Sequence, residues 1–260
     1  MTSRERSVAV LAGGAAGFFG GLFGVGGGII LVPLLTGPWR LSQHQAHGTS
    51  LAVILFTALA AGFVYATHGN VAWATGLIVG AASIFTAPLG VRAAGRLTSV
   101  GLTRTFSVFL MCVAIRLFWV PADHVAAVPV GPARIAIELA IGCAVGFIAG
   151  LVGVGGGILA VPAFRLLLGM SQTLAQGTSL LVILGAAGSG VIAHHRRGNI
   201  VRAPVPWLAI GAVLGGPLAS LWVQRLPQAL LVRGFAAFLI VTAALGWMKA
   251  GRTAPAAGPR

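Results

Sequence analysis

The chain has 260 residues, of which 57% are hydrophobic and only 8% are charged. A soluble domain is about one quarter charged, so this composition excludes an ordinary soluble protein and predicts an integral membrane protein. The net charge of +14 would suit nucleic acid, but the Lys and Arg residues are scattered between apolar segments without interleaved aromatic residues. We therefore expect no nucleic-acid partner and attribute the charge to the positive-inside bias of membrane proteins.

Eight apolar runs follow one another along the chain, and most approach the roughly 20 residues that a membrane-spanning helix needs. They cover residues 8–38, 43–66, 72–91, 99–120, 133–164, 173–193, 203–223 and 229–248. The beginning of the chain resembles a signal peptide, but the same pattern returns in mid-chain, so we keep it in the mature protein. The sequence thus predicts an all-α polytopic integral membrane protein.

The first run contains GLFGVGGGIILVP, Gly21 to Pro33, in which five glycines and a proline weaken a helix. Glycines also serve close packing, and Gly17, Gly21 and Gly24 would supply such a face. Packing does not explain three consecutive glycines followed by a proline, so we favour an unwound segment at GVGGG. Unwound backbone is tolerated in a membrane only where protein or a watery cavity satisfies it, so such a segment can bind ions.

The same pattern returns 129 positions later. Residues 17–33 are identical to residues 146–162 at 12 of 17 positions without a gap, and SQHQAHGTSL (42–51) falls on SQTLAQGTSL (171–180). Arg96-Leu97 falls likewise on Arg225-Leu226, and the proline-containing stretch 120–132 reads as the linker. The sequence therefore predicts two homologous membrane repeats of four hydrophobic segments each, at residues 1–125 and 126–260. Paired glycine- or proline-interrupted segments are typical of secondary transporters.

Charge counting leaves two topologies open. If all eight runs span and the N-terminus is inside, 9 of the Lys and Arg residues between the runs lie inside and 7 lie outside. This difference is too small to indicate an orientation. If the first and fifth runs are re-entrant hairpins that turn at GVGGG, the division becomes 12 to 4, with Arg40 inside and Arg165 outside. The second topology makes the repeats inverted copies, whereas one broken span in each repeat is the alternative.

These motifs resemble those of a known family. The signature GxxGxGGGxxxxP occurs at Gly21 to Pro33 and at Gly150 to Pro162, with GTS triplets at 48–50 and 177–179 and GN at 69 and 198. The chain resembles the TauE/SafE sulfite exporter family, also called the toluene sulfonate uptake permease family. The resemblance implies two repeats of four membrane segments and transport of sulfite, sulfonates or other small organic anions.

The two glycine breaks and the following hydroxyls form the predicted substrate site. Helix N-termini after Gly28 and Gly157 would offer free N–H groups and positive dipole ends to an oxyanion. The hydroxyls could instead bond their own helix backbone, and the two glutamines could merely cap a helix. The predicted substrate-binding residues are Gly26, Gly27, Gly28, Thr49, Ser50, Gly155, Gly156, Gly157, Thr178, Ser179, Gln43 and Gln172.

Few ionisable residues could couple transport to protons. His44 and His47 lie close to the first triplet and titrate near neutrality, although an interfacial histidine is often only a polar cap. The cluster His194 to Arg197 reads first as a cytoplasmic loop and second as an anion-attracting mouth. Glu138 stands four residues after Arg134, at the spacing of a helical ion pair.

The sequence therefore predicts a secondary transporter, and an exporter as the first hypothesis, for small sulfur-containing anions in the cell inner membrane. We expect no enzymatic activity, cofactor or metal, since three carboxylates and no nucleophile triad or metal-ligand cluster are present. The expected partners are the anionic substrate and the bilayer, and homo-oligomerisation stays open. A non-transporting membrane scaffold and a passive anion channel are the alternatives.

Overall fold

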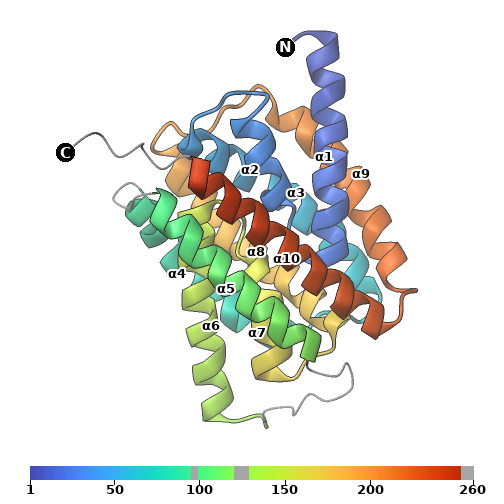
Figure 1. Cartoon of the computed structure of the whole chain (residues 1–260). Coiled ribbons are helices and arrows are strands. Elements are labelled where there is room, and N and C mark those ends of the chain that lie inside the picture. Colours follow the sequence, from blue (N-terminus) through green and yellow to red (C-terminus); the bar gives the residue numbers. More distant parts are fainter. Residues whose placement is uncertain (95–98, 120–128, 253–260) are drawn as a thin grey trace, which may run out of the picture.

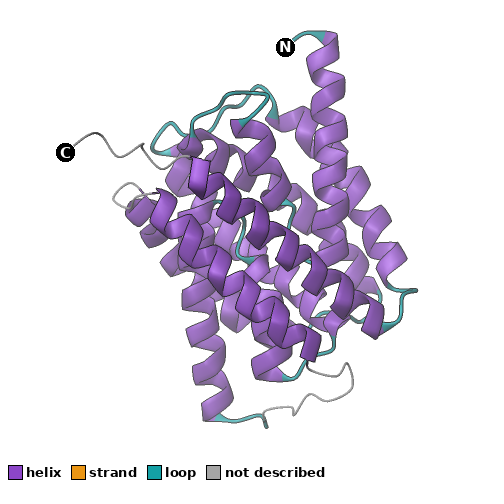
Figure 2. Cartoon of the chain, viewed as in Figure 1, coloured by secondary structure: helices purple, strands orange, loops and turns teal. Residues whose placement is uncertain are grey.

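A computed structural model describes residues 1–94, 99–119 and 129–252, and within these ranges every regular element is a helix (Figures 1 and 2). The helices are α1 (Ser3–Phe23), α2 (Gly28–Thr36), α3 (Gln43–Thr67), α4 (Trp73–Ala94), α5 (Ser99–Trp119), α6 (Pro132–Val152), α7 (Gly157–Leu168), α8 (Gln172–His195), α9 (Val205–Val223) and α10 (Gln228–Arg252). The predicted boundary at 125/126, most of the linker 120–132 and the Arg96-Leu97 match lie outside the described residues.

Seven of these helices are long and apolar enough to cross a membrane, which confirms the predicted all-α polytopic fold. The seven spans lie in α1, α3, α4, α6, α8, α9 and α10. By contrast, α2 and α7 have 9 and 12 residues and rise only about 14–18 Å at 1.5 Å per residue. Each of these two is therefore about half of a bilayer core in length.

Local sequence explains where α1 and α3 begin and where α1 and α6 end. Thr2 and Ser42 form capping boxes with the residues three positions later, Glu5 and Gln45. At the other ends, Gly24 and Gly153 adopt left-handed conformations with φ of 67° and 70°. Glycine adopts this conformation without the steric penalty of a Cβ, so both helices stop at the glycine-rich motif.

The chain reverses direction after each of these ends. A Cβ built on Gly27 would lie 2.8 Å from the carbonyl carbon of Ala16, and one built on Gly156 would lie 2.9 Å from the carbonyl oxygen of Val145. Eleven residues of straight helix would separate such positions by about 16 Å, so α2 returns along α1 and α7 returns along α6. The first turn of α1 stands at one end of the bundle and that of α6 at the opposite end (Figure 1).

Two helix pairs pack through glycines: α1 against α9, and α6 against α4. Cβ atoms built on Gly13 and Gly17 would lie 2.7 Å from the carbonyl carbon of Leu208 and 2.5 Å from the carbonyl oxygen of Ala212. Gly150 abuts Ala87 of α4 in the same way. Small residues let the two backbones approach this closely. The motif thus uses some glycines for packing and others to break the helix.

Candidate functional site

The two glycine breaks meet each other inside the bundle. A Cβ on Gly157 would lie 2.6 Å from the carbonyl oxygen of Gly24 and 2.7 Å from Cα of Val25. In the reciprocal contact, a Cβ on Gly28 would lie 2.8 Å from Cα of Val154. The structure therefore brings Gly26, Gly27 and Gly28 together with Gly155, Gly156 and Gly157.

Two helix N-termini begin at this meeting point. The N-cap residues of α2 and α7 are Gly27 and Gly156, both left-handed, and neither helix has a side-chain hydrogen bond at its cap. The first N–H groups of a helix have no partner within the helix. Two positive dipole ends with N–H groups that no side chain caps therefore face the centre of the site.

The C-terminal ends of α1 and α6 lie at the same place, but side chains bond their carbonyl groups. Ser179 donates its hydroxyl to the Gly24 carbonyl, and Ser50 donates to the Gly153 carbonyl over 2.6 Å. Tyr65 Oη donates to the Gly21 carbonyl over 2.9 Å. Hydroxyl donors thus satisfy the negative helix ends at the breaks, whereas no side chain caps the positive ends.

The hydroxyls of the GTS triplets connect the two halves of the chain. Besides the two serine bonds, Thr49 Oγ1 accepts from the Val201 N–H over 3.1 Å and Thr178 Oγ1 accepts from the Ala72 N–H over 2.9 Å. All four side chains are fully buried. Ser50 and Ser179 also bond within their own helices, to the carbonyls of His47 and Gln176. Each hydroxyl therefore holds the backbone of the other half, whether or not it also contacts substrate.

Two isoleucines cover the glycines. Ile54 of α3 and Ile183 of α8 are fully buried, and they are the side chains nearest to Gly26 and Gly155. A Cβ on Gly26 would lie 2.7 Å from Cγ2 of Ile54, and one on Gly155 would lie 3.1 Å from the same atom. Apolar side chains therefore close the space beside both breaks in this conformation.

The glutamines at equivalent positions have different environments. Gln43 is exposed, and its Nε2 lies 3.3 Å from Nε2 of His47. Gln172 is fully buried, and neither polar atom of its side chain has a hydrogen-bond partner. The same is true of Nε2 of the buried Gln176, whose Oε1 accepts from Tyr65 over 3.2 Å. Buried amide groups without partners indicate a place for a bound polar molecule or water.

The two candidate proton-coupling histidines differ in position. His47 is 7% exposed, and its Cα would lie 2.6 Å from a Cβ built on Gly153. It therefore lies directly beside the second break. His44 is exposed in the first turn of α3.

Four residues were missed or misplaced from sequence. Gln176 and Tyr65 were not predicted, although the alignment of Gln176 with His47 and of Tyr65 with His194 could have drawn attention to them. His194 was assigned to a loop, but it is buried at the end of α8, with Nδ1 3.4 Å from Nδ2 of Asn199. Arg165 was placed after the end of the fifth apolar run, but it lies within α7 and is 1% exposed.

The predicted pair of Arg134 and Glu138 is confirmed, with Nε of Arg134 3.1 Å from Oε1 of Glu138. Thr75 Oγ1 also donates to this carboxylate oxygen over 2.7 Å. The carboxylate is nearly buried, so the two donors stabilise its charge where α4 and α6 pack. Glu138 thus links α4 and α6, and it is not among the residues that contact the glycine breaks described above.

Replacing either serine should leave a buried carbonyl without its donor. We expect Ser50→Ala and Ser179→Ala each to lower the free energy of unfolding by about 1–3 kcal/mol, the cost of one unsatisfied buried polar group. Ser189→Ala is the matched control, because its hydroxyl bonds only Ala186 of its own helix among the described contacts. Thermal unfolding in detergent measures the difference, and equal midpoints for Ser50→Ala and Ser189→Ala would contradict the capping role.

Comparison with known proteins identifies the family. The family model described as Sulfite exporter TauE/SafE matches residues 1–117 and 137–260, which is nearly the whole chain and includes both glycine breaks. The chain belongs to the TauE/SafE sulfite exporter family. Its membership agrees with the multi-pass helical architecture described above.

Relatives of this TauE/SafE chain have names that describe membrane transporters. The chain is 29% identical to the probable membrane transporter protein YunE of Bacillus subtilis over 82% of this chain and 86% of that protein. It is 28% identical to a probable membrane transporter protein of Haemophilus influenzae over 90% of this chain and 95% of that protein. A Xylella fastidiosa protein of the same description is 28% identical over 94% of this chain and 95% of its own length. No solved structure matches the chain.

Proposed function

We propose that this protein is a secondary transporter that carries small sulfur-containing anions, such as sulfite or organosulfonates, across the cell inner membrane. One observation carries the proposal: at the two glycine breaks, side chains bond the carboxyl-terminal helix ends but do not cap the amino-terminal helix ends. Hydroxyl groups bond the carbonyls of Gly24 and Gly153, whereas the helices that begin at Gly28 and Gly157 have no side-chain cap. Helix N-termini without a side-chain cap favour a small oxyanion.

Alternating access suits this arrangement. Both breaks lie side by side, and Ile54 and Ile183 close the space next to them. A carrier needs a state in which its substrate site is shut from both sides, whereas a passive channel needs an open path. The hydrogen bonds that Thr49 and Ser50 make with the second half would then have to break or change partners when one half moves relative to the other.

Charge distribution supports an orientation with the N-terminus in the cytoplasm. Because α2 returns along α1, the connection from α2 to α3, which contains Arg40, lies on the same side of the bundle as the first turn of α1 (Figure 1). That first turn contains Arg4 and Arg6. Arg92, Arg196 and Arg197 lie at the ends of α4 and α8 on that side. Basic residues concentrate on the cytoplasmic side of membrane proteins. We propose export as the direction, with His47 as the first candidate for proton coupling and His44 as the second.

We infer a transport role rather than catalysis or scaffolding. A scaffold needs packing glycines such as Gly13 and Gly17, but it does not need uncapped helix ends at a break that contacts the buried Gln176. The required partners are the anion and the bilayer, without a resident cofactor.

Exchange of radiolabelled sulfite and sulfoacetate in proteoliposomes tests the proposal. We expect saturable exchange of at least one of these anions above protein-free vesicles, and no exchange of a labelled monovalent cation. An imposed pH gradient should change the rate if protons are coupled. His47→Gln should then remove that response, while His68→Gln, at an exposed histidine outside the site, keeps it. Flux that rises linearly with anion concentration would support a channel, and an absence of anion flux with folded protein would refute transport of these substrates.

A further inference from the structure

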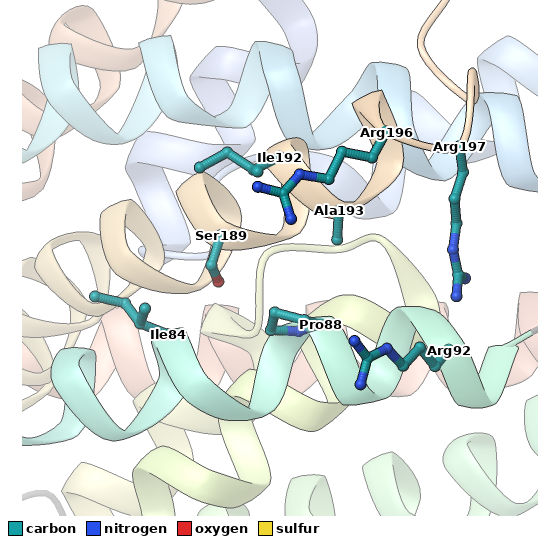
Figure 3. Close-up of a pocket in the computed structure, with 8 residues that line it drawn as sticks. All are labelled: Ile84, Pro88, Arg92, Ser189, Ile192, Ala193, Arg196 and Arg197. Carbon is teal, nitrogen blue, oxygen red and sulfur yellow. The ribbon is translucent and has the colours of Figure 1, made fainter.

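A pocket lies between α4 and α8, away from the glycine breaks (Figure 3). Its volume is about 380 Å³. It is lined by Ile84, Pro88, Arg92, Ser189, Ile192, Ala193, Arg196 and Arg197. The pocket therefore combines three guanidinium groups with an apolar wall, which the transport site described above does not explain.

Within the described part of the chain, no acidic side chain lines the basic end of the pocket. Arg92 lies in the last turn of α4, and Arg196 is the C-cap residue of α8. Their side chains extend over the pocket from its two walls (Figure 3). Arg197 is positioned by α4, since its Nη1 donates to the carbonyl of Val91 over 2.7 Å. Charges of the same sign repel one another, so a bound anion would relieve this cluster.

Among the residues that the structure describes, no carboxylate supplies that anion. Only three exist: Glu5 caps α1, Glu138 pairs with Arg134, and Asp123 lies outside the described residues. The negative ends of α4 and α8 oppose an anion, but each helix end carries only about half an elementary charge. Three full positive charges outweigh them.

The other end of the pocket is apolar and open. Ile84 is 43% exposed and Ile192 is 56% exposed, on helices that are apolar enough to span a membrane. In a bilayer such exposed side chains meet acyl chains. A small soluble anion would contact the guanidinium groups and leave this wall uncovered, whereas a lipid would cover both.

We propose that the pocket binds an anionic phospholipid, with its phosphate on Arg92 and Arg196 and one acyl chain along Ile84 and Ile192. Basic pockets between membrane helices are suited to anionic head groups at the bilayer surface. This site is separate from the substrate site, so it stands whether or not the chain transports sulfur-containing anions.

Native mass spectrometry of the full chain, titrated with phosphatidylglycerol or phosphatidylcholine, tests the proposal. We expect the wild type to retain phosphatidylglycerol in preference to phosphatidylcholine, and Arg92→Gln/Arg196→Gln to lower phosphatidylglycerol occupancy about fivefold or more. The matched control is Arg4→Gln/Arg233→Gln, which removes the same charge from exposed positions that do not line the pocket. Ala193→Phe, which fills the pocket and keeps its charge, should also lower occupancy.

Three results would overturn the proposal. Equal phosphatidylglycerol occupancy in the pocket variant and the control variant would exclude the arginines as the binding groups. Equal retention of both lipids by the wild type would leave only an apolar groove. Displacement of phosphatidylglycerol by inorganic phosphate at equal concentration would identify a site for free anions. Thermal unfolding of each variant confirms that folded proteins are being compared.

Discussion

Gly27→Ala is expected to abolish anion exchange while the protein still inserts into the membrane. Gly27 has φ of 86°, where an L residue is strained by about 1–2 kcal/mol. The added Cβ would also lie 2.8 Å from the carbonyl carbon of Ala16, which is backbone and cannot rotate away. The reversal between α1 and α2 would have to open, and the uncapped end of α2 would move from the site.

Gly69→Ala separates the two causes. Gly69 has φ of 72°, but a Cβ there would meet nothing within 4 Å, so this variant has the backbone strain without the collision. Exchange rates in proteoliposomes and thermal midpoints in detergent should be measured for both variants. We expect Gly69→Ala to keep exchange. If Gly27→Ala exchanged anions as fast as Gly69→Ala, the close return of α2 along α1 would not be part of the working protein.

Gly13→Ala is expected to separate α1 from α9 and to lower the free energy of unfolding. The Cβ would lie 2.7 Å from the carbonyl carbon of Leu208, again a backbone atom. The two helices must move apart, and the contacts around this point lose their dispersion energy. Overpacking of this kind costs about 1–3 kcal/mol or more.

The adjacent residue supplies the control for this second prediction. A Cβ on Gly14 would meet only the carbonyl oxygen of Gly211 at 3.8 Å, an ordinary van der Waals distance. Gly14→Ala should therefore be neutral, or should stabilise the protein by up to about 1 kcal/mol because alanine favours helix. Thermal unfolding of both variants in one detergent measures the difference. Similar midpoints would show that α1 and α9 are not packed this closely in the protein.

The sequence predicted much of the local structure because the motifs act through short-range chemistry. GVGGG interrupts the helix where the pattern indicated, since only glycine adopts φ of 67–86° at Gly24, Gly26 and Gly27 without strain. The spacing of Arg134 and Glu138 likewise predicted an ion pair on one helix face. Both features depend on residues that are neighbours along the chain.

Contacts between distant segments could not be predicted in this way. The serine that bonds the Gly24 carbonyl is Ser179, 155 residues away, and nothing in either local motif specifies that pairing. The same holds for Ile54 and Ile183, which look like ordinary helix residues until the fold places them beside both breaks. Arg165 was misplaced because an arginine after an apolar run usually lies in a loop, whereas tertiary packing buries this one.

The crossing hydroxyl bonds also set the order in which the protein can be completed. When the ribosome has made α1, α2 and α3, the Gly24 carbonyl still lacks Ser179, and Ser50 still lacks the Gly153 carbonyl. The first half therefore lacks these two hydrogen bonds until α6 and α8 have been synthesised and inserted. Synthesis of the second half is thus the step that completes the hydrogen bonding of the first. Each half depends on the other for a hydroxyl donor to the carbonyl at its glycine break.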